Sequence, residues 1–301
     1  MPKFSWVGAG NVTRYRLQLW LMLAPFLVGA FVLVVLPMLL TVGLAFTEYD
    51  ALSAPVWQGM QNFVVIAQRD LFQIAVRNSL IYVVLAVPLR LVGALGLALL
   101  LNRRRRGIDL YRTAVYLPTV IPAIAYALIW LWIYNPVYGP LNRLLGLVGL
   151  PEPAWLVNPQ TALLAIVLMA GFQIGEGFII LLAGLQDVPQ EYYDAAAVDG
   201  SNRWMTFRRV TLPLLLPWLV LLSIRDIIAS AQQTFAPAYL MTGGGPYYAT
   251  LFMPLLIFEE AFDRFRFGQA SAMMVVMFIG LGLLLYLLYR ATGGWGYADD
   301  V

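Results

Sequence analysis

Four ionisable side chains stand inside long apolar runs of the sequence, where a charge is costly. They are Arg90, Glu176, Arg225 and Asp226, and each costs roughly 2.5–3.5 kcal/mol on membrane-insertion scales. At about 1.5 Å of rise per helical residue, all four fall near the middle of a membrane. They could form an ion network that holds helices together or a polar lining for a solute path, and both interpretations stay open. Because Arg225 and Asp226 are neighbours about 100° apart on a helix, we expect that they cannot pair with each other and that each needs a partner elsewhere.

The stretch GFQIGEGF, residues 171–178, surrounds Glu176 with glycines. Gly171 and Gly175 have the GxxxG spacing typical of close helix packing. We expect the helix to be loosened here, as in transporter helices that line a site. Aromatic rings, amides and acids suit a polyhydroxylated solute. The candidate substrate-binding residues, from this stretch and from a later apolar run, are Phe172, Gln173, Glu176, Ser230, Gln233 and Thr234.

The sequence lacks the residue types on which most catalytic and metal sites depend. It has no cysteine and no histidine, and its only lysine is Lys3. Thiol catalysis and thiolate metal sites are therefore excluded, and the commonest general base is missing. A P-loop of the form GxxxxGK[ST] cannot occur either. We expect no metal and no cofactor on this chain, so any ATP and Mg²⁺ would be bound by a partner ATPase.

The elements that must position these residues are membrane helices. The chain has 301 residues, of which 61% are hydrophobic and 12% charged, whereas a soluble domain is about 25% charged. Six apolar runs are long enough to cross a hydrocarbon layer of about 30 Å. They lie at 18–46, 75–101, 113–134, 161–185, 211–234 and 270–290. The sequence thus predicts an all-α polytopic membrane protein, with a terminal segment 1–17, a six-helix domain 18–290 and a tail 291–301.

The placement of the basic residues predicts the orientation. With the N-terminus in the cytoplasm, twelve of the nineteen Lys and Arg residues lie inside and five outside, the other two being within apolar runs. This satisfies the positive-inside rule with both termini cytoplasmic. The RRRR run at 103–106 is then a topology signal at a short turn between spans, not a nucleic-acid patch. Three longer loops face outward, and we expect a short interfacial helix in the last of them; they are 48–74, 135–160 and 243–268.

One loop on the cytoplasmic side, 186–210, is polar and reads as a capped helix. In DVPQEYYDAAAVDG we expect Asp187 to cap the first turn, with Pro189 early in the helix and Gln190 three residues after the cap. Gly200 is placed to end the helix in a left-handed conformation. The alanines at 195–197 would let another protein surface approach closely.

The spacing within this loop resembles a known family signature. Asp194-Ala195-Ala196 is followed after three residues by Gly200, after nine more by Val210, and then by Leu212-Pro213. The pattern is similar to the EAA loop of ABC importer permeases, EAA-x3-G-x9-I-x-LP, with Asp and Val in place of Glu and Ile. The resemblance implies a coupling helix that docks on a cytoplasmic ATPase. The residues it assigns to coupling are Glu191, Asp194, Ala195, Ala196, Asp199, Gly200, Leu212 and Pro213.

A second stretch narrows the resemblance. YLMTGGGPYYAT at 239–250, followed by IFEEAFDRFRFGQASAMM, resembles the maltose-permease-like branch of carbohydrate importers. The resemblance implies a sugar substrate, with the segment before the EAA loop contributing to its pocket. It also implies four partners: a second homologous permease, a dimer of ATPase subunits, an extracytoplasmic solute-binding protein and the lipid bilayer. The location it implies is a bacterial or archaeal inner membrane.

Three functions other than a sugar permease are alternatives for this sequence. An ABC permease for amino acids or peptides shares the EAA loop but not the MTGGGP segment. A polytopic membrane enzyme would need a base, a nucleophile or a metal cluster, for which the composition offers little. A passive channel gives no reason for a coupling helix.

Overall fold

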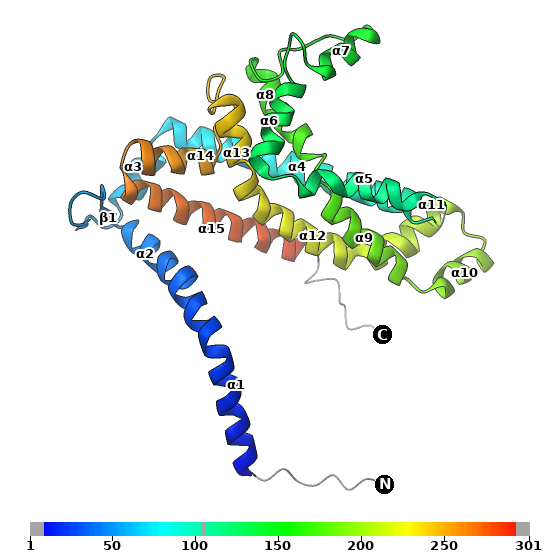
Figure 1. Ribbon diagram of the computed structural model, residues 1–301, viewed down its shortest axis with the longest axis horizontal. Helices are drawn as coiled ribbons and strands as arrows, with labels where there is room; N and C mark the ends of the chain where they lie inside the picture. Colours follow the sequence, from blue (N-terminus) through cyan, green and yellow to red (C-terminus); the bar gives the residue numbers. More distant parts are fainter. Residues whose placement is uncertain (1–8, 104–105, 293–301) are drawn as a thin grey trace.

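The computed structural model describes residues 9–103 and 106–292, and these are mostly helical. The first helix, α1 (Ala9–Ala30), continues through a π-helical turn, η1 (Phe31–Val35), into α2 (Leu36–Leu44). Figure 1 shows α1 standing away from the rest of the chain, while α2 leads back to the body, where it contacts α15. In the span Tyr15–Leu44, no residue of its apolar 18-residue stretch is buried against the described residues, so an apolar helix of this length must be covered by lipid or by another chain.

A small outer segment joins this helix to the body. Strands β1 (Thr47–Glu48) and β2 (Val56–Trp57) pair antiparallel, with Thr47 opposite Trp57. Helix α3 (Gln61–Ala67) then leads into α4 (Asp70–Leu101), the longest helix. The amide of Asn62 donates to the carbonyls of Ala45 and Thr47 at 2.9 and 2.8 Å, which fixes α3 to the start of the segment.

The run predicted at 113–134 is not one straight span. It consists of α5 (Ile108–Val120) and α6 (Ala123–Ile133), whose axes differ by 104°. Ile121 is extended, with φ −71° and ψ 127°, because a residue before proline is disfavoured in the helical region, and Pro122 follows it. The prediction of a continuous helix here was therefore wrong.

The run predicted at 161–185 is also interrupted. Helix α8 (Pro159–Ala170) and helix α9 (Gly175–Asp187) are bent by 45° at residues 171–174. The loosening expected near Glu176 is thus confirmed as a full break in the helix, immediately before Glu176. Between α6 and α8 lies the short α7 (Pro140–Leu147).

The second half of the chain contains the polar loop and the remaining spans. Its helices, in order, are α10 (Gln190–Val198), α11 (Arg203–Thr206), η2 (Phe207–Thr211), α12 (Leu212–Gln233), α13 (Phe235–Pro237), η3 (Ala238–Thr242), α14 (Met253–Phe258), η4 (Glu259–Asp263) and α15 (Phe267–Ala291). The pair α14 and η4 is the short helix expected in the last outer loop. Among the described residues, four helices are long and apolar enough to cross a membrane, and the number is six when each bent pair is counted as one span.

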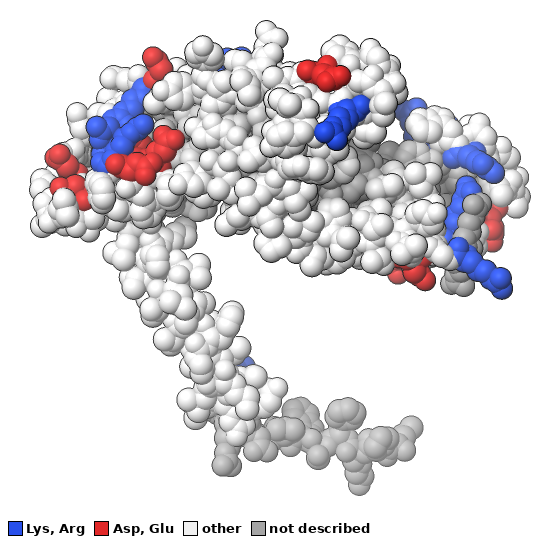
Figure 2. Space-filling model, turned by 45° about the horizontal axis from the view of Figure 1, so that its top comes forward, with Lys and Arg blue, Asp and Glu red and all other residues white. Residues whose placement is uncertain are grey.

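The packing places two polar regions at opposite ends of the body. Figure 1 shows α10 and α11 at one end and β1, α3 and α14 at the other. In Figure 2 charged side chains gather at the two ends of the visible face, and acidic and basic side chains also lie on its upper part, above a wide uncharged band. Between the ends, α4, α9 and α12 share a buried apolar cluster that includes Ala94, Phe178, Leu181 and Leu222.

Candidate functional site

A buried arginine links α4 to α12 in the middle of the apolar region. Arg90 and Asp226 are each only 4% exposed. Arg90 donates from Nη1 to Oε1 of Gln233 at 2.7 Å and from Nη2 to Oγ of Ser230 at 3.0 Å. Its Nε lies 3.7 Å from Oδ2 of Asp226. Burying a guanidinium requires such partners, and here they come from one face of α12.

Arg225 extends this network to α9. Its Nη1 lies 3.0 Å from Oδ1 of Asp226, and its Nη2 forms an ion pair with Glu176. The expectation that Arg225 and Asp226 cannot pair was therefore wrong, because the arginine stem is long enough to turn back along the helix surface. The expectation that each also has a partner elsewhere is confirmed, by Glu176 for Arg225 and by Arg90 for Asp226. Unlike the buried pair, Arg225 and Glu176 are half-exposed.

Glycines allow the helix break to pack closely against its neighbours. A Cβ on Gly175 would lie 2.8 Å from Cα of Tyr116 and 3.0 Å from Oγ1 of Thr119, so α9 touches the α5 backbone here. A Cβ on Gly171 would lie 2.8 Å from Cδ2 of Leu89 on α4. The close packing predicted from the GxxxG spacing is confirmed at both positions.

The six candidate substrate-binding residues fall into two environments. Phe172 is 59% exposed at the helix break, where its ring lies 5.0 Å from that of Trp130, and Glu176 is exposed beside Arg225. Ser230 and Thr234 are buried, and their hydroxyls donate to the carbonyls of Asp226 and Ser230 on the preceding turn. Gln233 accepts from Arg90, and Gln173 lies half-buried in the break. Contact of any of the six with a solute stays a prediction.

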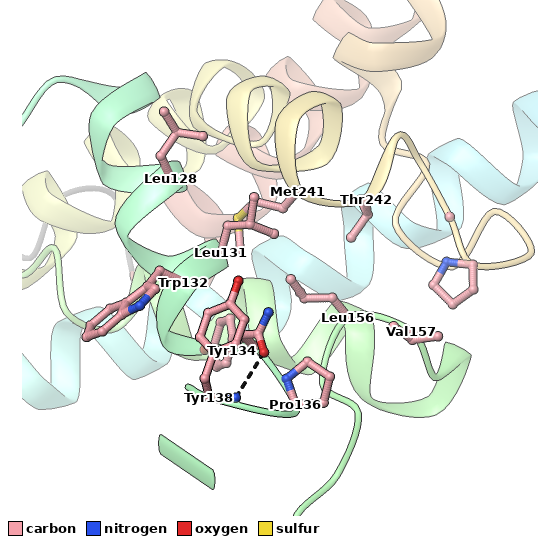
Figure 3. A pocket seen from close by; sticks show the side chains of 13 residues that line it. Leu128, Leu131, Trp132, Tyr134, Pro136, Tyr138, Leu156, Val157, Met241 and Thr242 are labelled. Carbon is pink, nitrogen blue, oxygen red and sulfur yellow. Dashed lines mark hydrogen bonds between the residues drawn. The ribbon is translucent and has the colours of Figure 1, made fainter. Parts of the chain in front are cut away.

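A cavity of about 610 Å³ beside the end of α6 was not predicted from the sequence. Figure 3 shows side chains at the end of α6, such as Leu131 and Tyr134, on the side of the cavity toward Met241 and Thr242 of η3. Asn135 holds the turn after α6 by accepting from the backbone nitrogen of Tyr138 at 3.1 Å. The cavity lies between the loop 135–160 and the MTGGGP segment. In the sequence, only the aromatic residues near 132–138 indicated a site here.

A row of aromatic rings runs from the helix break to this cavity. The ring centres of Phe172 and Trp130 are 5.0 Å apart, as are those of Trp130 and Tyr134. Trp155 follows at 5.6 Å from Tyr134. Such tilted ring contacts stabilise packing beyond simple burial, so the break and the outer loop are held by one rigid wall.

The polar loop forms the second candidate site. Helix α10 ends at Gly200 as predicted, with φ +74°. The backbone nitrogen of Ser201 donates to the carbonyl of Ala196 at 2.9 Å, and the backbone nitrogen of Gly200 donates to the carbonyl of Ala197 at 3.1 Å. These are the two hydrogen bonds of a Schellman cap. Asp187 does not cap this helix. It is the last residue of α9, because Pro189 and the extended Val188 separate the two helices.

The surface of α10 is open to a partner. Within the described chain, Glu191, Asp194 and Asp199 are exposed, and so are the apolar side chains of Tyr192 and Val198, at 53% and 89%. Ala196 is the buried residue of the helix. An exposed apolar side chain flanked by carboxylates is typical of a docking surface.

One side-chain contact joins α10 to η2, and a helix cap directs the chain after α10 toward the next membrane helix. The hydroxyl of Thr211 in η2 donates to that of Tyr193 at 3.4 Å. The side chain of Asn202 caps α11 by accepting from the nitrogen of Met205 at 2.9 Å, which directs the chain into η2 and α12. Leu212 and Pro213 form the first turn of α12.

Comparison with known proteins gives the family. The profile of the family described as "Binding-protein-dependent transport system inner membrane component" matches residues 94–293. The chain belongs to this family. It is a permease subunit of an ABC importer, a transport protein of the inner membrane and not an enzyme, and the resemblance drawn from residues 194–213 is confirmed. Within the described residues, no group of three or more acidic side chains is placed to hold a metal ion.

Relatives and solved structures match this permease along nearly its whole length. The probable ABC transporter permease protein YesP of Bacillus subtilis is 37% identical, over 96% of this chain and 95% of its own. The trehalose/maltose transport system permease protein MalF of Thermococcus litoralis is 31% identical, over 91% and 92%. A chain of a bacterial ABC transporter involved in the import of the acidic polysaccharide alginate has a TM-score of 0.80 at 22% identity, over 94% and 97%. That structure supports the six-span permease fold.

Proposed function

We propose that this permease forms half of the translocation pathway of an ATP-driven sugar importer and is driven through α10. The observation that carries the proposal is the position of α10. It is a short, capped, exposed helix that follows α9 after two residues and is joined to α12 through α11 and η2, and α9 and α12 carry Glu176, Arg225 and Asp226. A displacement of α10 would therefore be transmitted to the intramembrane charges through short connections.

The partners of this pathway follow from the two polar ends. The end with α10 would face the cytoplasm and dock on a dimer of ATPase subunits, which bind ATP and Mg²⁺. Both chain termini would lie on that side. The opposite end would receive solute from an extracytoplasmic binding protein, and a second, homologous permease would complete the pathway.

A carbohydrate is the solute class that the residues favour. Phe172 offers an exposed aromatic face, and Gln173 and Glu176 follow it at the helix break. Aromatic rings contact the C–H faces of sugars, while amides and carboxylates bind their hydroxyls. The names of relatives, among them a trehalose/maltose permease and a diacetylchitobiose uptake permease, agree with this class. A permease for amino acids or peptides is the second candidate.

Uptake by the reconstituted importer tests the proposal. The chain would be assembled in liposomes with its partner permease, its ATPase and the binding protein encoded beside it. We expect ATP-dependent accumulation of an oligosaccharide and no accumulation of amino acids or peptides. Accumulation of a peptide instead would contradict the sugar assignment, and uptake without ATP would contradict the coupling role of α10.

A further inference from the structure

Two membrane spans are interrupted at one level of the body, where a third helix, α4, is continuous but contains a proline. The break between α8 and α9 spans residues 171–174, and Gly171 at its start lies against Leu89, next to Pro88 inside α4. Gly175 at its end lies against Tyr116 and Thr119, near the bend at Ile121 between α5 and α6. Proline removes an intrahelical hydrogen bond, and breaks of this kind are the places where helices bend.

The four intramembrane charges lie beside this level, on the side of α10. Arg90 comes two residues after Pro88, and Glu176 two residues after the break at 171–174. Arg225 and Asp226 join them from α12, which is helical throughout Leu212–Gln233 although Pro217 lies inside it. The charges thus connect the parts of α4, α9 and α12 that lead toward α10, at the point where the α8–α9 span is bent and α4 contains Pro88.

We propose that Arg225 is a positioning residue of transport, which ties α9 to α12 so that these helices and α10 move as one body about the breaks. The inference rests on the proposed role of α10. Arg225 contacts two carboxylates at once, one buried on its own helix and one on α9. A guanidinium fork holds two carboxylates in fixed directions, whereas an ammonium is a compact charge with rotatable donors that does not fix their positions.

Other contacts between α9 and α12 support their movement as a unit. Gly184 of α9 packs so closely on Trp218 of α12 that a Cβ would lie 2.9 Å from the indole Cδ1. Leu181 and Leu222 share the buried cluster between them. The Arg225–Glu176 pair is the polar contact at the end of this interface that is farther from α10 and nearer the breaks. A contact at that end resists the separation of α9 from α12 most effectively.

The absence of cysteine makes a distance measurement straightforward, because spin labels can be placed at introduced cysteines alone. One pair, Leu168→Cys with Ile179→Cys, crosses the break between α8 and α9. The other pair, Ile179→Cys with Leu221→Cys, crosses the α9–α12 interface. All three residues are exposed in the described chain, at 42%, 44% and 47%. Distances would be measured by pulsed electron paramagnetic resonance in the full importer with cysteine-free partners, without nucleotide and with ATP trapped.

We expect the 168–179 distance to change between the two states and the 179–221 distance to stay single and narrow. In Arg225→Lys, which keeps the charge but not the fork, the 179–221 distribution should broaden, and ATP hydrolysed per solute imported should rise several-fold. Glu176→Gln should do the same, and the double variant should be no worse than either single one, since both break the same contact.

The matched control is Arg264→Lys. Arg264 also contacts two adjacent carboxylates, Glu259 and Glu260, and its side chain is 37% exposed against 38% for Arg225. This change should leave the 179–221 distance and the ATP cost of import as in the unmodified chain.

Two results would overturn the proposal. One is a 179–221 distance that changes with nucleotide in the unmodified importer. The other is a distance and an ATP cost that stay unchanged in Arg225→Lys and Glu176→Gln. Sugar uptake by the same preparations is read separately, so a failure of the sugar assignment is distinguishable from a failure of this inference.

Discussion

Replacing Gly175 by alanine should disrupt the packing of α9 against α5. The added Cβ would lie 2.8 Å from a backbone atom of Tyr116 and 3.0 Å from the carbonyl oxygen of Val115, and backbone cannot move aside as a flexible side chain can. Overpacking of this kind costs about 1–3 kcal/mol. Because Gly175 is the first residue of α9, alanine regains only part of the ~1 kcal/mol of interior helix propensity, so the net loss should be about 1–2 kcal/mol.

Gly177→Ala is the matched control two residues along the same helix. Its Cβ would meet Ala94 at 3.4 Å and Leu222 at 3.9 Å, which are ordinary contacts. This variant should be as stable as the original chain or slightly more stable, because only the propensity gain remains. The expected order of unfolding midpoints in detergent is therefore Gly177→Ala at or above the original chain, with Gly175→Ala clearly below. Equal midpoints for the two variants would refute the close approach of α9 to α5.

Two further predictions concern the solute site and the outer charges. Phe172→Ala or Gln173→Ala should lower transport and leave assembly and basal ATP hydrolysis largely intact. Uptake and hydrolysis assays on the purified importer would show this. Full uptake with unchanged sugar preference in both variants would mean that neither residue lines the pocket. Glu260 is 1% exposed and pairs with three arginines that are 28–49% exposed, so Glu260→Gln should cost about 2–3 kcal/mol, below the ~3–5 kcal/mol of a fully buried pair. Burial raises the pKa of the neighbouring Glu259, and Arg264 opposes this shift. Folding therefore does not favour the ionised form of Glu259, and Glu259→Gln should change stability by no more than about 0.5 kcal/mol. Thermal unfolding of the two variants would compare them, and equal losses would contradict this account of the outer charges.

The membrane helices and the loop cap could be predicted from the sequence because both depend on local pattern. Long apolar runs have few structural alternatives in a bilayer, and Gly200 stands where a helix must turn left-handed. The bend at Ile121 could also have been predicted from the sequence, since Pro122 follows it. Hydropathy alone, however, does not distinguish one membrane span from two half-spans. Likewise Pro189 could have indicated that Asp187 closes α9 and does not open α10.

The charge network could be predicted only in part. Apolar surroundings identified Arg90, Glu176, Arg225 and Asp226 as unusual, and depth counting placed them together. The pairing of Arg225 with its own neighbour depends on side-chain rotamers, which spacing along a helix does not fix. The cavity near Tyr138 needed the tertiary contact between two loops that are about a hundred residues apart in the chain.

Recovery of the ATPase with a Gly200→Asp variant tests the central claim, that α10 docks on the ATPase. Gly149 provides a matched control in an outer loop. Its φ of +73° equals that of Gly200 within a degree, both Cβ positions are open, and both residues close a Schellman cap. Each change to aspartate therefore carries the same backbone cost of about 1–2 kcal/mol and the same added charge.

The measurement is the amount of ATPase subunit that co-purifies with each tagged variant, together with solute-stimulated ATP hydrolysis and uptake. Both variants should insert in the membrane. We predict that Gly200→Asp loses the ATPase, the stimulation and uptake, because its carboxylate crowds the docking surface beside Asp199, while Gly149→Asp retains the ATPase at the level of the original chain. Full recovery of the ATPase and full stimulation with Gly200→Asp would contradict the account, and α10 would then be a surface helix without a coupling role.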